Sequence, residues 1–379
     1  MTDSTKPIAG EFDVAVVGAG PMGSFAAQRM AQAGLSVALL EKDANPGDST
    51  VCAGGMHHDL VRFLNLPSTV IEKVLPAFRY TLNGRNAEWR FGDPTYVTVE
   101  RRRLDVLLAE RAVQAGAKLY TGTRVVGAVP EKGTLFCESG DDERLFETHA
   151  KVFVFADGAN SLARRILTPA SRAGSRPQFV GLEYDLEAPA NSLDALEIIP
   201  DPKNLPFGYL WVFPKRDHIN VGLARLDSMS GPTLNTLLSE FIATRPDLRG
   251  QRVMRRKGGV IPASLNPVLQ KDNWLVIGDA AGMVNPLTGG GYVCGFVSAA
   301  IAAETCIDAF RGGSFQAKAM CKYQSRLRWT KHYIVVRLMH IALSVMTSTY
   351  RAINKPVWLP FLRVYFSAVH IAMRFIPVI

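Results

Sequence analysis

The chain has 379 residues, of which 47% are hydrophobic and 20% are charged. This length and composition predict a globular protein of about two domains and exclude a disordered or collagen-like chain. The net charge of +9 is concentrated near the C-terminus, because eleven lysines and arginines and no acidic residue follow Asp308. These positive residues alternate with large apolar ones. The pattern argues against a nucleic-acid partner and indicates an anionic membrane surface.

Cysteine usage and the N-terminal sequence indicate the compartment. The five cysteines are scattered and lack the CxxC spacing of a metal site, which argues against zinc or an iron–sulfur cluster and for a reducing environment. The first twelve residues are polar and lead directly into an apolar strand, so we see no signal peptide. We therefore expect a cytoplasmic protein.

Residues 12–41 are predicted to form a strand, a glycine turn, an amphipathic helix and a second strand. Gly18 permits the tight turn, Gly20 lets a pyrophosphate approach the backbone, and Gly23 lets helix and strand pack closely. The phosphate would bind at the helix N-terminus, where backbone N–H groups are unpaired. Glu41, followed by Lys42, ends the second strand, where a carboxylate accepts hydrogen bonds from ribose hydroxyls. The expected contacts in the turn are Gly18, Gly20, Pro21, Met22 and Gly23.

The following segments predict a discontinuous α/β domain that contains an inserted sheet. Residues 101–125 form a helix and a strand, and residues 134–157 a polar-turned hairpin followed by a buried strand that ends at Asp157. Alternation in period two over residues 175–265 predicts an antiparallel sheet. Residues 273–307 then return to a strand, a glycine-rich loop and a long helix.

The glycine-rich loop distinguishes between the cofactors that share the first fingerprint. The strand before it ends at Gly278 and Asp279, where a carboxylate can accept from a ribityl or ribose hydroxyl, and Gly290 and Gly291 bring backbone close to a flat ring. With Asp157, these elements resemble the FAD-dependent oxidoreductases of the p-hydroxybenzoate hydroxylase fold, over most of residues 10–305. The resemblance implies a Rossmann-like FAD-binding domain of that type, an inserted antiparallel β-sheet substrate domain and a C-terminal helical segment.

Two further motifs, "STVCAGGM" around Cys52 and "GYLWVFPK" from Gly208, look like the geranylgeranyl reductase family, whose members saturate carbon–carbon double bonds of prenyl chains. That family usually has a small or aliphatic residue where Tyr292 stands here. Arg101 is chosen among three neighbouring arginines because Leu104 and Asp105 follow at the family's spacing. The resemblance implies FAD contacts at Glu41, Cys52, Ala53, Gly55, Arg101, Val125, Asp279, Gly291 and Tyr292.

The implied reaction is hydride transfer from reduced FAD to one alkene carbon and protonation of the other. Candidate acids are Cys52, His57, His58 and Tyr209, with Cys52 expected near the flavin ring. Tyr209, Trp211 and Phe213 share one strand face and would line the apolar substrate, although such rings also fill ordinary sheet cores. No second nucleotide fingerprint is visible, so the electron donor could be NADPH or ferredoxin.

Three alternatives stay open from the sequence. A flavin-dependent monooxygenase or halogenase would share the fold, and "LWVFP" partly echoes a halogenase element. An electron-transferring-flavoprotein oxidoreductase would need a four-cysteine cluster motif that the sequence lacks. A non-catalytic prenyl-lipid carrier of related fold is the third, but the flavin-binding elements are intact.

The expected domains follow from this pattern. Residues 10–75, 100–170 and 268–310 form the FAD-binding domain, residues 76–99 and 175–267 the substrate domain, and residues 311–379 a basic, apolar helical segment. The longest uncharged run of that segment, Leu338 to Tyr350, is too short to span a bilayer. It would either cap the protein's own core or lie peripherally on the cytoplasmic face of a membrane.

Overall fold

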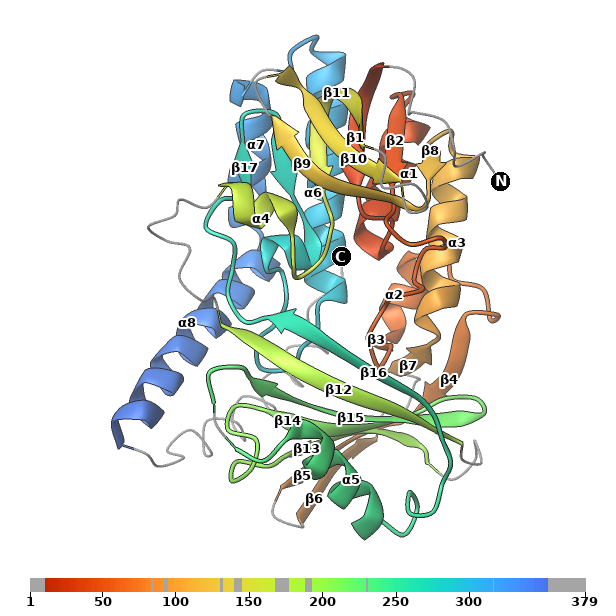
Figure 1. Cartoon of the computed structure of the whole chain (residues 1–379), viewed down its shortest axis with the longest axis vertical. Coiled ribbons are helices and arrows are strands. Elements are labelled where there is room, and N and C mark those ends of the chain that lie inside the picture. The colour runs from red at the N-terminus through yellow and green to blue at the C-terminus, as the bar shows by residue number, and fades with distance from the viewer. Residues whose placement is uncertain are drawn as a thin grey trace. The chain divides into compact units, whose positions relative to one another are not determined.

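The structure is a computed structural model that describes residues 11–82, 85–90, 95–129, 132–139, 145–167, 177–187, 193–229, 231–315 and 317–353. The chain divides into two units, which are described separately (Figure 1). The first unit comprises Met1–Thr50, Arg101–Arg176 and Ser264–Leu338, and the second Val51–Glu100, Pro177–Ala263 and Met339–Ile379. Residues 354–379, the end of the expected C-terminal helical segment, lie outside the described residues.

The core of the first unit is a parallel sheet with the strand order β18-β11-β1-β2-β8. The central strands β1, β2 and β18 are apolar and largely buried, as expected of a parallel sheet that is covered on both faces. The order is that of a Rossmann fold, which confirms the predicted α/β class. The strands are β1 (Glu11–Val17), β2 (Val37–Leu40), β8 (Lys118–Tyr120), β11 (Leu145–Phe155) and β18 (Trp274–Val276).

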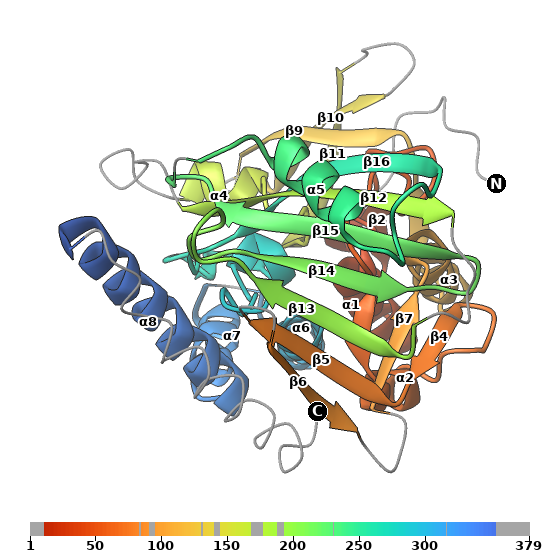
Figure 2. The same ribbon diagram turned by 90° about the horizontal axis from the view of Figure 1, so that it is seen from below.

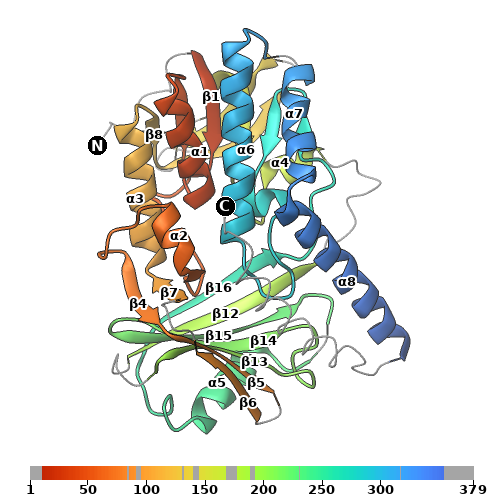
Figure 3. The ribbon, with the colours of Figure 1, turned by 180° about the vertical axis from the view of Figure 1, so that it is seen from behind.

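Antiparallel strands and helices complete the first unit. β17 (Gln270–Lys271) pairs with β18, and β9 (Thr123–Val129) and β10 (Thr134–Ser139) form a branch from β11, including the predicted hairpin. Figure 3 shows α3, α1, α6 and α7 on one face of the sheet. The helical elements are α1 (Pro21–Gln32), α3 (Arg101–Gln114), α4 (Leu162–Leu167), η3 (Gly278–Ala281), α6 (Tyr292–Arg311) and α7 (Ala317–Arg328), and α8 (Lys331–Ile353) follows them.

Within the residues that the structure describes, α6 is the one helix long and apolar enough to cross a membrane. However, 56% of its most apolar stretch is buried inside the protein, where it packs against α1 and α7. Burial of this kind is typical of a core helix, so the composition of α6 is weak evidence for a membrane span.

The second unit is built on a seven-stranded sheet with the order β16-β12-β15-β14-β13-β5-β6, seen from below in Figure 2. All its pairs are antiparallel except β13 with β5. Its strands β12 to β16 lie in residues 175–265, the region predicted from period-two alternation, which also contains a helix that the alternation did not predict. Its strands are β5 (Ala77–Leu82), β6 (Arg85–Arg90), β12 (Gln178–Glu187), β13 (Ala195–Pro200), β14 (Tyr209–Pro214), β15 (His218–Leu226) and β16 (Val253–Pro262).

A smaller sheet changes the expected domain boundary. β3 (Gly55–His57) and β4 (Ile71–Leu75) pair with the two sides of β7 (Tyr96–Val99), and α2 (His58–Phe63) lies between β3 and β4 in the chain. Residues 51–75 therefore fall in the second unit, whereas the sequence analysis assigned them to the FAD-binding domain. The reason is long-range strand pairing with β7, which local periodicity does not reveal. The expected C-terminal segment is likewise divided, at Leu338.

The two faces of the seven-stranded sheet are chemically different. Leu210, Val212 and Val221 lie on the face that forms an apolar core with α5 (Leu234–Thr244). Since side chains alternate along a strand, Tyr209, Trp211 and Phe213 lie on the opposite face, which we call the aromatic face. The apolar cluster that the sheet forms with α5 therefore does not include these three rings.

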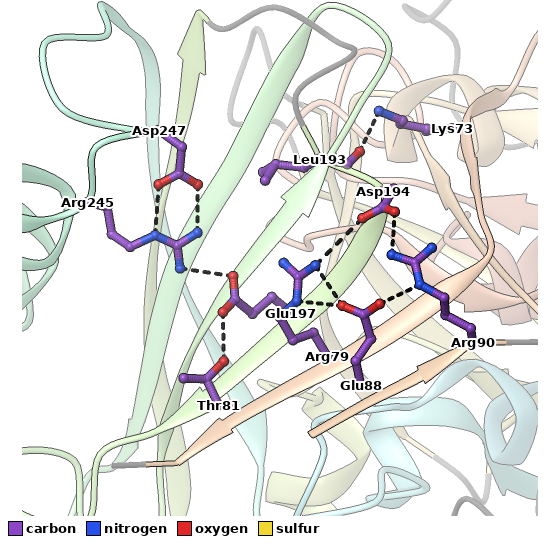
Figure 4. A network of polar contacts seen from close by, with 10 residues as sticks. All are labelled: Lys73, Arg79, Thr81, Glu88, Arg90, Leu193, Asp194, Glu197, Arg245 and Asp247. Atoms are coloured by element: carbon purple, nitrogen blue, oxygen red, sulfur yellow. Dashed lines mark hydrogen bonds and ion pairs between the residues drawn. The ribbon is translucent and has the colours of Figure 1, made fainter. Parts of the chain in front are cut away.

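An ion-pair network stabilises the α5 side of the sheet (Figure 4). Glu197, buried on β13, pairs with Arg245 at 2.9 Å and accepts a hydrogen bond from Thr81 at 2.8 Å. Arg245 also donates two hydrogen bonds to Asp247. These bonds fix its guanidinium beside the buried carboxylate of Glu197. None of the residues predicted for the site belongs to this network, which consists of Lys73, Arg79, Thr81, Glu88, Arg90, Leu193, Asp194, Glu197, Arg245 and Asp247.

Candidate functional site

The expected dinucleotide site lies at the carboxyl ends of β1, β2, β11 and β18 in the first unit. These parallel strands end at one edge of the sheet, so the loops that follow them converge. A Cβ on Gly18, whose φ is +100°, would stand 2.5 Å from the carbonyl oxygen of Ala156. A Cβ on Gly23 would stand only 1.9 Å from the carbonyl oxygen of Gly18. The turn after β1 is therefore closed by backbone-to-backbone contacts that only glycine permits.

Gly20 is different from its two neighbours. It has an extended conformation at the N-cap of α1, no side chain caps the helix there, and a Cβ would meet nothing within 4 Å. Unpaired N–H groups of a helix N-terminus, with open space in front of them, form an anion-binding cradle. Pro21 is the first residue of α1, and Met22 packs against Gly278 and Gly295, which joins the turn to the β18 loop and α6.

Glu41 is held in a fixed position at the end of β2. Its two carboxylate oxygens accept from the backbone N–H groups of Ala19 (2.8 Å) and Asp43 (3.0 Å). Burial raises the pKa of this carboxyl above 4.5, while the two amide donors act in the opposite direction. Thr123 donates its N–H to the Glu41 carbonyl, which places half-buried Val125 on the neighbouring strand β9. The side chain of Lys42 binds Asp43 instead, at 2.6 Å.

Asp157 follows β11 and lies behind the Gly18 turn. Its Oδ2 accepts from the Leu162 N–H at 2.6 Å, whereas its buried Oδ1 has no hydrogen-bond partner among the described residues. Burial raises the pKa of the Asp157 carboxyl. A buried polar atom without a partner is a candidate contact for a bound polar group.

The Gly278 loop forms the other half of the edge. Burial raises the pKa of Asp279, and the nearby Arg101 guanidinium lowers it. A Cβ on Gly291 would stand 3.1 Å from Asp279 Oδ1, so the glycine leaves this carboxylate accessible from the start of α6. Arg101 lies over the Tyr292 ring at 5.6 Å and pairs with Asp105.

The start of α6 also resembles that of α1. Gly291 is its N-cap and no side chain caps the helix, so its first backbone N–H groups can also donate hydrogen bonds to an anion. Gly290 donates its N–H to Thr288 Oγ1 and accepts from the Asn285 N–H, which closes the loop tightly before the helix. The residues at this edge therefore fit a dinucleotide: two uncapped helix starts and three carboxylates.

The Cys52 loop belongs to the second unit and crosses the aromatic face. A Cβ on Gly259 of β16 would stand 3.0 Å from the Val51 Cβ, and one on Gly55 would stand 2.7 Å from the Phe213 ring. The loop therefore runs from β16 to β14, with half-buried Cys52 between these contacts. Lys215 Nζ donates to the carbonyl oxygens of Ala53 (2.5 Å) and Val99 (2.9 Å).

Lys215 is the most deeply buried cation near this loop. It is 3% exposed, and burial lowers its pKa from 10.5, opposed by several acidic groups of which Cys52 is the first. This lysine ends the motif "GYLWVFPK", from which no role for it was predicted. Its two carbonyl contacts give it one, which is to fix the backbone of the Cys52 loop.

Trp211 is held by contacts that sequence reasoning missed. A Cβ on Gly222 would stand 2.2 Å from the indole Cζ2, so the ring covers this glycine. The indole Nε1 donates to Asn220 Oδ1 at 2.8 Å, Asn220 donates to Asp185 at 2.9 Å, and Arg255 pairs with Asp185 at 2.9 Å. The sequence did contain a sign of these polar contacts. Polar residues occupy alternate positions of "GLEYDLE" and "HINVG", on a strand face that should be apolar if it were core.

One of the candidate acids, His57, has a structural role. His57 is the N-cap of α2, where its Nδ1 accepts from the Asp59 N–H, and burial lowers its pKa. His58 is the first residue of that helix. Tyr209 makes an edge contact with the Trp211 ring, at 6.1 Å between centroids.

Comparison with known proteins is consistent with this geometry. The family model described as "Lycopene cyclase protein" matches residues 13–366. A digeranylgeranylglycerophospholipid reductase of Methanocella arvoryzae is 33% identical over 333 residues, which cover 84% of this chain and 83% of the relative. The chain belongs to the geranylgeranyl reductase family. A second relative of the same name, from Methanopyrus kandleri, is 31% identical and covers 85% of this chain and 87% of the relative.

Solved structures show how the fold is shared. A geranylgeranyl bacteriochlorophyll reductase-like protein of Thermoplasma acidophilum superposes with a TM-score of 0.79, covers 87% of this chain and 88% of its own, and is 23% identical. A flavin-dependent brominase gives 0.69 with 17% identity and 90% coverage of both chains. At these identities the likeness concerns the fold alone. Together with the family, it confirms the predicted FAD-dependent oxidoreductase.

Proposed function

We propose that this protein reduces carbon–carbon double bonds in the prenyl chains of a lipid. The observation that carries the proposal is the aromatic face. Tyr209, Trp211 and Phe213 lie outside the core that the sheet forms with α5, and Trp211 is fixed by Gly222 and Asn220. A rigid apolar wall beside the Cys52 loop suits an unsaturated chain that offers no polar group to bind. The curated relatives named above act on a digeranylgeranyl lipid by name, which supports this substrate class.

When reduced, FAD would supply the hydride, and residues of this chain would hold the FAD molecule. Gly20 and the start of α1 would bind the pyrophosphate, and Glu41 the adenosine ribose. Asp157 Oδ1 and Asp279 would accept from further hydroxyls, while Gly290, Gly291 and Tyr292 would border the ring. Arg101, Val125 and the Cys52–Gly55 loop complete the proposed set, of which Cys52, Ala53 and Gly55 belong to the second unit.

The test is reduction of a defined lipid. The purified protein, loaded with FAD and reduced with dithionite, is mixed with digeranylgeranylglycerophospholipid or with geranylgeranyl diphosphate. We expect products heavier by two hydrogens for each bond reduced, measured by mass spectrometry. Repeating the assay with NADPH or reduced ferredoxin in place of dithionite tests which of these two donors the enzyme accepts. Flavin oxidation that depends on oxygen, without any hydrogenated lipid, would instead favour the monooxygenase alternative.

We further propose that the protein is cytoplasmic and that α8 binds an anionic membrane surface. Ile334, Leu338, Ile341 and Val345 are 41% to 59% exposed and follow one another at helical spacing, so they form a single apolar stripe. Tyr333, Val336 and Leu343, on the opposite face, are buried. Trp329 is 84% exposed just before the helix, and the absence of acidic residues after Asp308 gives the segment its positive charge.

Replacing both Leu338 and Ile341 with Glu should weaken binding to phosphatidylglycerol vesicles at least about tenfold, since each change removes apolar area and adds an unfavourable charge. Vesicle sedimentation measures this, with phosphatidylcholine vesicles as the uncharged reference. Leu145→Glu is the matched control, because Leu145 is a 64% exposed leucine of β11 and its variant should bind as the parent does. If the parent protein itself does not sediment with anionic vesicles, the membrane proposal is wrong.

A further inference from the structure

Glu183 is a buried carboxylic acid on the aromatic face. It pairs in register with Gly222 of β15, which pairs in turn with Trp211 of β14, so the three residues form one row across neighbouring strands. Gly222 contributes no side chain, and the Trp211 ring covers it. The Glu183 carboxyl and the Trp211 indole therefore lie on the same face of the sheet. The residue between them in this row is a glycine, which has no side chain. Glu183 is 2% exposed.

The hydrogen bonding of Glu183 differs from that of its neighbour Asp185. Asp185 is paired with Arg255 and accepts from Asn220, as expected of a structural carboxylate. The buried Oε1 of Glu183 has no hydrogen-bond partner among the described residues. A buried carboxyl oxygen without a donor is costly as an anion, so this environment favours the protonated acid.

The charges around Glu183 come from several strands. Burial is the largest effect and raises its pKa above 4.5, and Asp185 on the same strand acts in the same direction. Lys257 on β16, Lys215 after β14 and Asn220 on β15 act against it. The acid therefore retains its proton at higher pH than an exposed glutamate.

The Cys52 loop, in which Cys52 is expected to contact the flavin, lies on the same face of the sheet as Glu183. The loop crosses the aromatic face between Gly259 of β16 and Phe213 of β14, and Glu183 lies on β12, between those strands in the sheet. Lys215, which fixes the loop, interacts electrostatically with both Cys52 and Glu183. The two groups therefore share one neighbourhood in the second unit.

We propose that Glu183 is the catalytic acid that protonates the alkene, an inference that rests on the proposed function. One alkene carbon takes the hydride, and the other forms a C–H bond with the proton of Glu183 as its O–H bond breaks. The substrate thereby gains two hydrogens and two electrons, and the Glu183 carboxylate takes up a proton from solvent before the next turnover. This role is distinct from those of Cys52, His57, His58 and Tyr209, the acids suggested by sequence.

The test compares Glu183→Gln with Glu187→Gln in the FAD-loaded, reduced enzyme. Gln has the size of Glu but no acidic proton, so we expect hydrogenation of digeranylgeranylglycerophospholipid to slow about 100-fold or more. Glu187 lies on the same strand, is exposed and pairs with Arg252, so its variant should keep the parent rate. Glu183→Asp, which retains an acid, should recover part of the rate. Flavin absorbance and circular dichroism verify that each variant is folded and loaded.

Two pH measurements separate a catalytic acid from a packing residue. The parent rate should fall as pH rises through the pKa of Glu183, and Glu183→Gln should lose this limb. In the protein without substrate, the folded state binds more protons than the unfolded state from pH 4.5 upward to the raised pKa. The stability of the parent should therefore decline with rising pH over this window, relative to Glu183→Gln.

Each result has a defined meaning. A Glu183→Gln enzyme that hydrogenates the lipid at the parent rate, or with the parent pH profile, overturns the assignment while leaving the proposed function intact. A parent enzyme that hydrogenates no prenyl lipid overturns the proposed function, and the catalytic role of Glu183 with it. Equal pH dependence of unfolding in the parent and in Glu183→Gln would show that the acid is not held protonated, which also contradicts the proposal.

Discussion

Trp211→Ala should slow hydrogenation of the prenyl chain about 100-fold or more, while the protein keeps its FAD. The indole covers Gly222 and its Nε1 donates to Asn220, so it offers a surface of fixed position to the alkene. Without the indole, the alkene is free to move by more than about 1 Å. A misplacement of roughly 1 Å already lowers the rate by about two orders of magnitude. Single-turnover oxidation of the reduced flavin by the lipid measures the effect.

Leu210→Ala is the matched control for this prediction. Leu210 is buried on the same strand, but on the face that packs against α5. Loss of either large side chain should lower the free energy of unfolding by about 2–5 kcal/mol. At a temperature well below both unfolding transitions, Leu210→Ala should hydrogenate the lipid at close to the parent rate. If Trp211→Ala loses FAD at that temperature, or is too unstable to fold at all, the aromatic face is ordinary core and the substrate assignment is wrong.

The edge of the first unit could be predicted because its signals are local. Gly18, Gly20 and Gly23 stand within six residues, and Glu41 ends the next strand, so periodicity and spacing place them without any long-range information. Asp157 and Asp279 follow from the same rule, since each lies two or three residues after an apolar strand, β11 or β18. The topology then brings four strand ends to one edge.

The aromatic face could be predicted only in part. Period two places Tyr209, Trp211 and Phe213 together, but Leu210 and Val212 make the other face equally apolar, so sequence does not show which face is core. The packing of α5 decides this. The row from Glu183 through Gly222 to Trp211 depends on the register of three strands. The Cys52 loop is placed by contacts with Gly259 and Phe213, which are more than 150 residues away in the chain. Pairings between distant segments leave no periodic signal.

Gly23→Ala should destabilise the first unit, whereas Gly20→Ala should weaken FAD binding without that cost. Alanine favours a helix over glycine by about 1 kcal/mol, which would make Gly23→Ala stabilising on propensity alone. A Cβ there stands 1.9 Å from the carbonyl oxygen of Gly18, however, and this neighbour is backbone and cannot move aside. We expect a net loss of about 3 kcal/mol or more in the free energy of unfolding, with loss of bound FAD.

The Gly20→Ala variant separates the fold from the cradle. Its Cβ would enter open space at the start of α1, so the protein without cofactor should unfold at the same denaturant concentration as the parent. Because the methyl group would occupy the path by which a pyrophosphate approaches the backbone, FAD should bind at least about tenfold more weakly, a cost of about 1.4 kcal/mol. Flavin fluorescence titration and denaturant unfolding distinguish the two variants. FAD binding by Gly20→Ala with the parent's affinity would show that the pyrophosphate does not lie on this helix, and the assignment of the turn would then fail although the fold stands.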